Sequence, residues 1–519
     1  MRTKKQFKNG KRRRALRIIG FLLILLCILV ARSIVWVLSE WADLQIDEIV
    51  WQLTSPLRGT GGGIISSYMK EVLPFTLAVF VMIMAVYFLM GKFRLLKTNR
   101  LYIRFVFIAA LAVAFSTVTY FCTELHAVEW LINRHKESSF IEDHYVNPDD
   151  VQLTFPKKKR NLLYIYLEST EITYTDKKNG GAFDEDVIPE MTQLAESDEA
   201  EDFEGKDHGT TLNGGIALSD TTFTMGAMFG DTSGLPLKIS INRNRMDTQT
   251  QFFPSITTLG DILDKEGYRQ ILLIGSQSVF GGRKLYFTSH GNYEMRDYDY
   301  YKNNGTLPQG YKVWWGFEDE KLFQYAKDTL SELDKGGQPW NLTMLTVDTH
   351  FTDGYVCRLC RDDFSDQYSN VFACASRQVT QFLEWAKTQD WYDDTAIILT
   401  GDHPTMDANY CQRVPRSYQR KTYTAFINSA VKPAENRHRE YATLDYFPTT
   451  LAAMGVKIDG DRLGLGTNLF SNKETLVEKY GATEINLQID RHSSFMEKLE
   501  GKVKAATADV KISDYNPET

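Results

Sequence analysis

Polar side chains that suit metal or phosphate chemistry come shortly after four apolar runs that lie far apart in the chain. The runs and the polar residues after them are NLLYIYL (161–167) with Glu168, QILLI (270–274) with Ser276, NLTMLTV (341–347) with His350, and TAIILT (395–400) with Asp402 and His403. Short runs of apolar and β-branched residues are typical of buried strands in a parallel sheet. In an open α/β sheet, ligands bind beyond the carboxyl ends of the strands. The four runs therefore predict that these polar residues line one site.

Glu168, Asp402 and His403 are the candidate metal ligands of the sequence. Two carboxylates and an imidazole supply mixed oxygen and nitrogen ligands, which suit Mn²⁺ or Zn²⁺ more than Ca²⁺. A metal ion there could neutralise the charge of a phosphodiester during hydrolysis or transfer. The alternative for Asp402 and His403 is a helix N-cap followed by a surface histidine. His350 suits proton transfer or substrate contact, or else it is a histidine of the core.

The candidate nucleophile lies in the hydroxyl-rich segment LSDTTFTMG (218–226). The small residues at its end could begin a helix, and a helix N-terminus would stabilise an attacking alkoxide and a phosphoryl group. Composition does not choose among Thr221, Thr222 and Thr224, and threonine-rich stretches are also common in loops. Arg283 follows two glycines beyond a strand end, where it could clamp a phosphate or lie at the surface as a solvated cation.

The first 123 residues have the pattern of a membrane anchor. A basic tail, residues 1–14, carries eight Lys and Arg and no acid. Within residues 15–123 there are three apolar segments close to the ~20 residues that cross a bilayer. They are about Leu16–Leu38, Val72–Gly91 and Phe105–Thr123. The loop after the first segment is acidic and the next loop is basic, so the positive-inside rule predicts that the chain after Glu124 lies outside. The first segment could instead be a cleaved signal peptide.

The remaining sequence predicts one α/β domain with a mostly parallel central sheet. Residues 124–160 have the charged composition of a juxtamembrane linker, and residues 161–471 alternate strands with helical patterns. The helical patterns are Ile256–Glu266, Glu318–Leu333, Ser376–Trp391 and Thr443–Met454. Residues 472–519 are a polar extension with one expected amphipathic helix at about Ile485–Val503.

The six cysteines fall into two groups. Two lie in apolar segments, and Cys357, Cys360, Cys374 and Cys411 lie in the outer domain. An even number of cysteines in an oxidising compartment favours disulfides. A four-cysteine zinc site is the alternative, because Cys357 and Cys360 form a C-x-x-C pair, although the sequence has no second such pair.

At these residues the chain resembles the phosphoglycerol transferases of the sulfatase fold, which belong to the alkaline phosphatase superfamily and include lipoteichoic acid synthase and the enzyme that decorates periplasmic glucans. The resemblance covers about residues 161–471 and the membrane helices before them. Its motifs are YLEST, the threonine segment that ends in SGLP, WWGFEDE, LTVDTHFTDGY, LTGDHPTMD and LGLGTNLF. The C/S-x-P-x-R signature of true sulfatases is missing, so we do not expect the sulfatase reaction.

The resemblance implies roles for individual residues. It assigns one divalent metal, Mn²⁺ with Mg²⁺ or Zn²⁺ as alternatives, to Glu168, Asp402, His403 and the nucleophile. Counting back from SGLP places the nucleophile on Thr221, with Thr222 as the fallback. His350 and Arg283 match substrate-binding residues of the family. The glucan-modifying relatives have two cysteines at the positions of Cys360 and Cys374, which implies a Cys360–Cys374 disulfide and leaves Cys357–Cys411 as the second pair.

Together these patterns predict a multi-pass protein of a bacterial plasma membrane with an extracytoplasmic catalytic domain. Outside the cell there is no nucleotide-activated donor, so a lipid such as phosphatidylglycerol is the expected source of glycerol phosphate. The expected acceptor is a glycan or glycolipid, the expected intermediate is a phospho-threonine, and no nucleic acid is expected as a partner. The alternatives are a lipoteichoic-acid-type polymerase, a phosphoethanolamine transferase, and an anchored binding module without activity.

Overall fold

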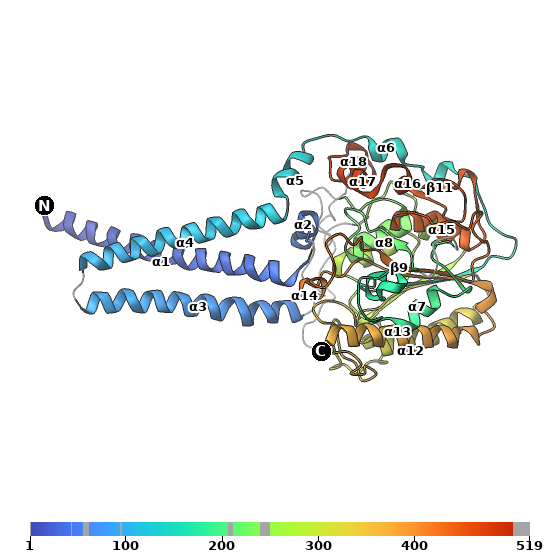
Figure 1. Ribbon diagram of the computed structural model, residues 1–519, viewed down its shortest axis with the longest axis horizontal. Helices are drawn as coiled ribbons and strands as arrows, with labels where there is room; N and C mark the ends of the chain where they lie inside the picture. The colour runs from blue at the N-terminus through green and yellow to red at the C-terminus, as the bar shows by residue number, and fades with distance from the viewer. Residues whose placement is uncertain are drawn as a thin grey trace. The chain divides into compact units, whose positions relative to one another are not determined.

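The computed structural model describes residues 2–42, 44–54, 62–93, 96–205, 211–238 and 250–501. The chain forms two compact units (Figure 1). The first consists of Met1–Leu44 and Gly61–Leu131, and the second of Gln45–Thr60 and Ile132–Thr519. The last part of the predicted extension, residues 502–519, lies outside the described residues, as do the side chains of the basic tail.

The first unit consists of long apolar helices that contact one another. They are α1 (Arg2–Glu40), α3 (Gly62–Lys92) and α4 (Leu96–Glu124). Each contains a stretch long and apolar enough to cross a membrane, at Ala15–Glu40, Ile65–Met90 and Leu101–Glu124. Phe105 and Phe115 are each 71% exposed, which suits a lipid surrounding far better than water. The three predicted apolar helices are therefore confirmed, each a few residues longer than expected.

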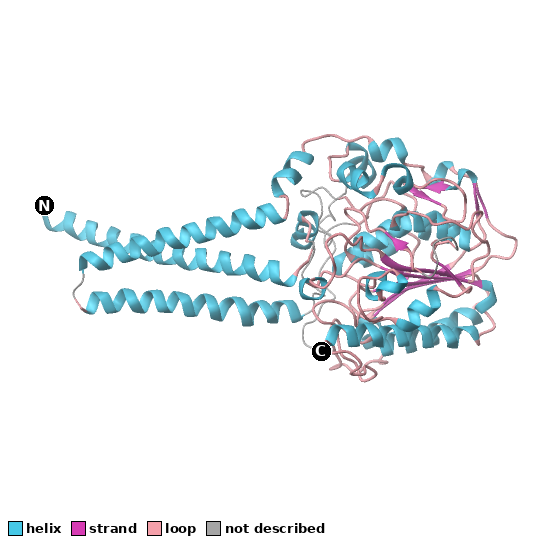
Figure 2. Cartoon of the chain, in the orientation of Figure 1, coloured by secondary structure: helices cyan, strands magenta, loops and turns pink. Residues whose placement is uncertain are grey.

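The second unit is built around a central sheet (Figure 2). The sheet has eight strands in the order β3-β9-β8-β2-β7-β5-β6, with β4 paired to β9. The strands are β2 (Asn161–Leu167), β3 (Ala200–Glu201), β4 (Gly214–Gly215), β5 (Arg269–Ile274), β6 (Glu294–Arg296), β7 (Trp340–Leu345), β8 (Thr395–Gly401) and β9 (Thr422–Ile427). From β8 to β6 every pairing is parallel, and β9 adds an antiparallel edge. Two-stranded sheets pair β1 (Leu153–Thr154) with β10 (Lys457–Ile458) and β11 (Arg462–Leu463) with β12 (Gly466–Thr467). The mostly parallel sheet is confirmed, and the four apolar runs are its central strands.

Helices cover both faces of this sheet. Figure 1 shows α12 and α13 side by side along one face and α8 and α15 along the other. α5 (Ala127–Asn133) contains the sequence boundary between the two units. The helices that follow it are α6 (Phe140–His144), α7 (Pro189–Ala195), α8 (Thr224–Ser233), α9 (Leu259–Lys265), α10 (Arg283–Ser289), α11 (Tyr298–Asn303), α12 (Asp319–Lys335), α13 (Gln367–Lys387), α14 (Ala408–Cys411) and α15 (Tyr446–Ala453). In α12, Leu322, Ala326 and Leu330 recur at helical spacing and are fully buried, which explains why this amphipathic segment packs against the sheet.

The region after residue 471 belongs to the core of the second unit. It forms α16 (Leu476–Tyr480), α17 (Ala482–Ile489) and α18 (Ser494–Glu500), where one helix at Ile485–Val503 was predicted. Ile485, Ile489 and Met496 are at most 2% exposed and join the hydrophobic core. α17 and α18 are separate helices because the chain turns between them, at residues 490–493. The turn lets the apolar faces of both helices reach the same core.

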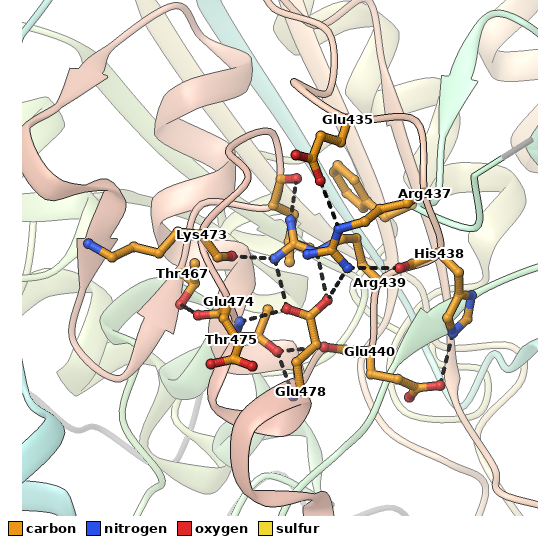
Figure 3. Close-up of polar contacts among 12 residues, drawn as sticks. Glu435, Arg437, His438, Arg439, Glu440, Thr467, Lys473, Glu474, Thr475 and Glu478 are labelled. Carbon is orange, nitrogen blue, oxygen red and sulfur yellow. Dashed lines mark hydrogen bonds and ion pairs between the residues drawn. The ribbon is translucent and has the colours of Figure 1, made fainter.

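A buried arginine fastens this C-terminal region to the sheet domain (Figure 3). Arg439 is 3% exposed and donates to the backbone oxygens of Leu469, Ser471 and Lys473 at 2.6–3.0 Å. Its Nε donates to Glu478 Oε1 at 2.8 Å. Because the guanidinium satisfies three carbonyl groups and one carboxylate at once, residues on both sides of position 471 are held as one piece.

A short helix from the segment between α1 and α3 also joins this core. The helix is α2 (Ile46–Thr54), and it belongs to the second unit. Trp51 is 7% exposed and lies 5.5 Å, ring centre to ring centre, from Phe223. The carboxylate of Glu48 accepts a hydrogen bond from Thr222 Oγ1. No helix was expected from the sequence in this acidic loop.

Candidate active site

The sheet register brings Glu168 and Asp402 together. β2 and β8 are parallel neighbours, and Leu167 pairs with Gly401, so the next residue on each strand emerges at the same level of the same edge. The backbone N–H of Ser169 donates to Asp402 Oδ1 at 2.8 Å. Ser169 has a φ of +56°, which turns the chain sharply after Glu168. The strand ends therefore place two carboxylates side by side, as the sequence predicted.

Glu168, Asp402 and His403 form a buried group whose ligand atoms all lie within 4.8 Å of one another. From His403 Nε2 the distances are 3.3 Å to Asp402 Oδ2 and 3.6 Å to Glu168 Oε1. Ligands bound tetrahedrally at ~2.1 Å from a cation are about 3.4 Å apart, which agrees with both distances. The three residues are at most 2% exposed. The arrangement thus fits a divalent metal ion.

The tautomer of His403 also suits a metal ligand. Its Nδ1 lies 2.9 Å from the backbone oxygen of Pro404, and a carbonyl oxygen can only accept. Nδ1 therefore carries the hydrogen, and the lone pair of Nε2 faces the two carboxylates. Burial lowers the pKa of His403, but the charges of Asp402 and Glu168 outweigh burial and raise this pKa overall.

The two carboxyl groups share a buried space in which each disfavours the charge of the other. Burial, and then the neighbouring Asp402 carboxylate, raise the pKa of Glu168 to about 8. Asp402 Oδ2 is buried and has no hydrogen-bond partner among the described residues. A buried anionic oxygen without a partner is costly, and a bound cation would remove that cost. This supports the same conclusion as the interatomic distances.

Of the three candidate threonines, Thr224 has its hydroxyl at this group. Thr224 is the first residue of α8, and its Oγ1 lies 3.4 Å from His403 Nε2. This is again the spacing of two ligands that share one cation. The position at the helix N-terminus adds the positive end of the helix dipole and free backbone N–H groups, both of which favour a phosphate.

The structure does not bring the other two threonine hydroxyls to the metal-binding group. Thr221 is fully buried, and its Oγ1 donates to the backbone oxygen of Leu218 at 2.8 Å. Thr222 donates to Glu48 of α2 instead. Thr221, the predicted position, lies before the first residue of α8, and its hydroxyl is bonded to Leu218. The useful signal was the small residues after Thr224, which mark the start of the helix.

Arg283 lies close enough to Glu168 and Asp402 for their charges to affect its pKa. It is the first residue of α10, is 5% exposed, and its Nη2 donates to Ser276 Oγ at 3.1 Å and to the backbone oxygen of Gln277 at 3.2 Å. Burial lowers the pKa of Arg283 to about 10, while Glu168, Asp297 and Asp402 act against burial. Among the described residues Arg283 has no ion pair, so its charge is available for an anionic ligand.

His350 is held as a neutral imidazole. Burial, with help from the charges of His403 and Arg283, lowers its pKa to about 4. Nδ1 lies 2.7 Å from the backbone oxygen of Phe351, so Nδ1 carries the hydrogen and Nε2 can accept a proton. The ring lies 4.6 Å from that of Trp315, and the side chain is partly exposed.

A buried ion pair behind the site was not found from the sequence. Glu171 is fully buried, and Arg420 binds it with Nη2 at 2.6 Å and Nε at 2.9 Å. Glu171 also accepts from the backbone N–H of Thr405 at 2.9 Å, just after His403. The pair therefore fixes the loop that carries the metal ligands. The only sequence signal was an acid two residues after YLES.

No disulfide is present among the described residues. Cys357 lies beside Cys360 and Cys374, with sulfur–sulfur distances of 3.7 Å to each. The sulfur of Cys411 is 3.7 Å from the backbone oxygen of Thr405. The expected pairs Cys360–Cys374 and Cys357–Cys411 are thus not formed, because three of the four cysteines meet at one place.

Comparisons with known proteins agree with this architecture. Residues 160–456, more than half of the chain, match the sulfatase family. Phosphoglycerol transferase I of Escherichia coli O127:H6 is 30% identical over 327 residues, which are 62% of this chain and 40% of that protein. The same values hold for phosphoglycerol transferase I of Shigella boydii serotype 18. The chain therefore spans about 40% of the length of these relatives.

Two solved structures match the chain at lower similarity. Lipoteichoic acid synthase LtaP from Listeria monocytogenes is 16% identical with a TM-score of 0.47, over 64% of this chain and 82% of that chain. Lipooligosaccharide phosphoethanolamine transferase A from Neisseria meningitidis is 14% identical with a TM-score of 0.47, over 84% of both chains. The match of residues 160–456 and the sheet with its strand-end ligands lead to one conclusion: the chain belongs to the sulfatase family.

Proposed function

We propose that this protein is a phosphoglycerol transferase that moves glycerol phosphate from phosphatidylglycerol to a glycan or glycolipid. The observation that carries the proposal is the hydroxyl of Thr224, which lies 3.4 Å from His403 Nε2 at the N-terminus of α8. A hydroxyl in that place can act as a nucleophile toward phosphorus. The similarity to phosphoglycerol transferase I supports the choice of the transferred group.

The first step transfers the phosphoglycerol group to the protein. Thr224 Oγ loses its proton and forms a bond to phosphorus, and the bond between phosphorus and the diacylglycerol oxygen breaks. The proton lost by Thr224 is balanced by the one that the diacylglycerol oxygen takes up from solvent, so diacylglycerol leaves with a hydroxyl group and glycerophospho-Thr224 remains. The N-terminus of α8 and the guanidinium of Arg283 stabilise the phosphoryl oxygens through their positive charge. We thus propose Thr224 as the nucleophile, the role that the sequence analysis assigned to Thr221.

The second step transfers the group to the acceptor. An acceptor hydroxyl gives its proton to Nε2 of His350 and attacks phosphorus, and the bond to Thr224 Oγ breaks. The threonine oxygen regains a proton, which restores the starting state. At neutral pH His350 is unprotonated, so Nε2 can take this proton, and its lowered pKa favours passing the proton on to the leaving threonine oxygen.

A divalent cation, Mn²⁺ in our proposal, would be held by Glu168, Asp402 and His403 and would supply the positive charge that stabilises the threonine alkoxide and the phosphoryl group. We further propose that α1, α3 and α4 cross a bacterial plasma membrane and that the second unit works outside the cell. The loop at residues 92–104, between the second and third apolar segments, is basic, which supports this orientation. Such an anchor would keep the site near its lipid donor.

The test is the mass of the full-length protein, purified in detergent and incubated with phosphatidylglycerol and Mn²⁺. We expect a glycerophosphate adduct on the peptide that contains Thr224. The adduct should disappear in Thr224→Ala and persist in the matched variants Thr221→Ala and Thr222→Ala. An adduct that disappears in Thr221→Ala but persists in Thr224→Ala would contradict our choice of nucleophile.

Parallel incubations separate the alternative donors and products. An adduct from phosphatidylethanolamine, but not from phosphatidylglycerol, would identify a phosphoethanolamine transferase and refute the proposal. With an acceptor present, a single added phosphoglycerol supports the transferase, and chains of several units would indicate a lipoteichoic-acid-type polymerase. If no lipid gives an adduct, the covalent mechanism is refuted.

A further inference from the structure

Three cysteines meet in the loop after β7 and on α13, away from the group that Thr224 contacts. Cys357 and Cys360 lie in the loop and Cys374 on the helix, and all three sulfur atoms are within 4.8 Å of one another. Cys357 is 5% exposed, Cys374 is 2% exposed, and Cys360 is partly exposed. Apolar side chains would fill this space equally well. The meeting of three buried or partly buried sulfur atoms at one point therefore needs another physical reason.

The spacing of the sulfur atoms is that of metal ligands. Both distances from Cys357 Sγ, to Cys360 Sγ and to Cys374 Sγ, are 3.7 Å. Thiolates bound tetrahedrally at ~2.3 Å from Zn²⁺ are about 3.8 Å apart, whereas the two sulfur atoms of a disulfide are ~2.05 Å apart. A disulfide would also use only two of the three sulfur atoms. The C-x-x-C spacing of Cys357 and Cys360 is common in zinc sites.

A buried side-chain donor reaches two of the three cysteines, as donors do at metal-bound thiolates. Gln378 is 7% exposed and lies one turn after Cys374 on α13. Its Nε2 donates to Cys374 Sγ at 3.4 Å and lies 3.9 Å from Cys357 Sγ. Donors of this kind stabilise charged sulfur and orient the ligands of a metal.

We propose that Cys357, Cys360 and Cys374 bind a thiophilic divalent cation, Zn²⁺, in a site separate from Glu168, Asp402 and His403. Three thiolates leave a fourth coordination position for water on the partly exposed side of Cys360. Its ligands are different residues from those of the group at the strand ends, so zinc binding can be tested separately from the proposed transferase activity.

This site would have a structural purpose near the active site. Its loop begins after β7, and the same loop carries His350. Tyr355 donates its backbone N–H to the backbone oxygen of Asp348 at 2.7 Å, and Tyr368 Oη of α13 donates to the backbone oxygen of Thr349 at 2.7 Å. A cation that joins Cys357 and Cys360 to Cys374 would fasten this loop to α13 and so fix the position of His350.

The test measures metal in the full-length protein, purified without reductant or chelator, by mass spectrometry of the elements. We expect one equivalent of zinc that is lost in Cys357→Ser and in Cys374→Ser. It should remain in Cys411→Ser, the matched control, and in Asp402→Asn. Replacement of the zinc by Co²⁺ should give a thiolate-to-cobalt charge-transfer band, which carboxylate and histidine ligands alone do not produce.

A measurement on the unchanged protein covers the case in which the cysteine variants fail to fold. Titration of the thiols with an organic mercurial should release one zinc ion as three thiols react, and a zinc-binding dye reports the release. The proposal is overturned if peptide mapping finds a disulfide between any two of the three cysteines. It is equally overturned if the folded cysteine variants keep their zinc or if the mercurial releases none.

Discussion

At the scale of single residues, the proposed chemistry rests on one contact. Thr224 Oγ1 and His403 Nε2 are 3.4 Å apart, which is long for a hydrogen bond but right for two atoms that share one cation. Asp402 Oδ2, buried and without a hydrogen bond among the described residues, belongs to the same group. These side chains are therefore arranged around a position that suits a bound cation.

We expect Mn²⁺ to stabilise the folded protein and Asp402→Asn to remove this effect. A ligand that binds only the folded state adds about 2.7 kcal/mol at a hundredfold excess over its Kd. The measurement is the melting temperature of chelator-treated protein during an Mn²⁺ titration. Asp393→Asn, an exposed acid in the turn before β8, is the matched control and should keep the whole increase. An equal increase in Asp402→Asn would contradict the assignment of this ligand.

His438 should make stability depend on pH. Hydrogen bonds to Glu204 and Glu440 raise its pKa to about 9, well above its usual value near 6.5 (Figure 3). A pKa raised in the folded state contributes stability that is complete below pH ~6.5 and is lost as the pH rises through about 9. The stability difference between the wild type and His438→Gln should follow this curve. A difference that is constant from pH 6 to pH 10 would show that His438 does not carry a charge in the folded protein.

At the scale of elements, the pairing of β2 with β8 is what delivers two carboxylates to one point. The register from Asn161–Thr395 to Leu167–Gly401 is continuous, and the first residue past each strand is a ligand or lies beside one. α8 delivers Thr224 to the same edge by its N-terminus. Small displacements of these strand ends should therefore affect metal binding as strongly as the loss of a ligand.

Gly401→Ala tests this expectation. A Cβ at Gly401 would lie 1.7 Å from the backbone oxygen of Thr170, far inside van der Waals contact, so the end of β8 must move. We expect a loss of at least ~3 kcal/mol in the free energy of unfolding, as for severe overpacking, together with weaker metal binding. Gly310→Ala is the control, because nothing lies within 4 Å of its Cβ. Unchanged metal affinity in Gly401→Ala would show that the strand end is not the determinant.

At the scale of the whole molecule, the elements that could be predicted are those whose pattern is local. Strands of buried apolar residues and amphipathic helices such as α12 follow from periodicity, and the strand-end ligands follow from the edge rule of parallel sheets. Thr224 was among the candidates, but the choice required the first residue of α8, and helix ends are set by tertiary packing as much as by sequence.

Contacts between residues far apart in the chain could not be predicted from the sequence, because they are not set by a local pattern. The three-cysteine cluster joins a loop to a helix, and the pairing of cysteines does not follow from their order in the chain. Arg439 satisfies carbonyl groups some 30 residues away in the sequence, which makes residues 472–501 part of the core rather than an extension. Neither contact leaves a periodic signal.

The placement of α2 has a consequence for how the protein is made. The chain passes from the first unit to the second at residue 45, returns at residue 61, and passes again at residue 132. One piece of the second unit is therefore synthesised before α3 and α4, and Trp51 must wait for Phe223 before it can be buried. The second unit cannot complete its core until both later apolar helices have been made. A chain that starts at residue 132 lacks that piece, so it would leave Phe223, the residue before Thr224, without its aromatic neighbour.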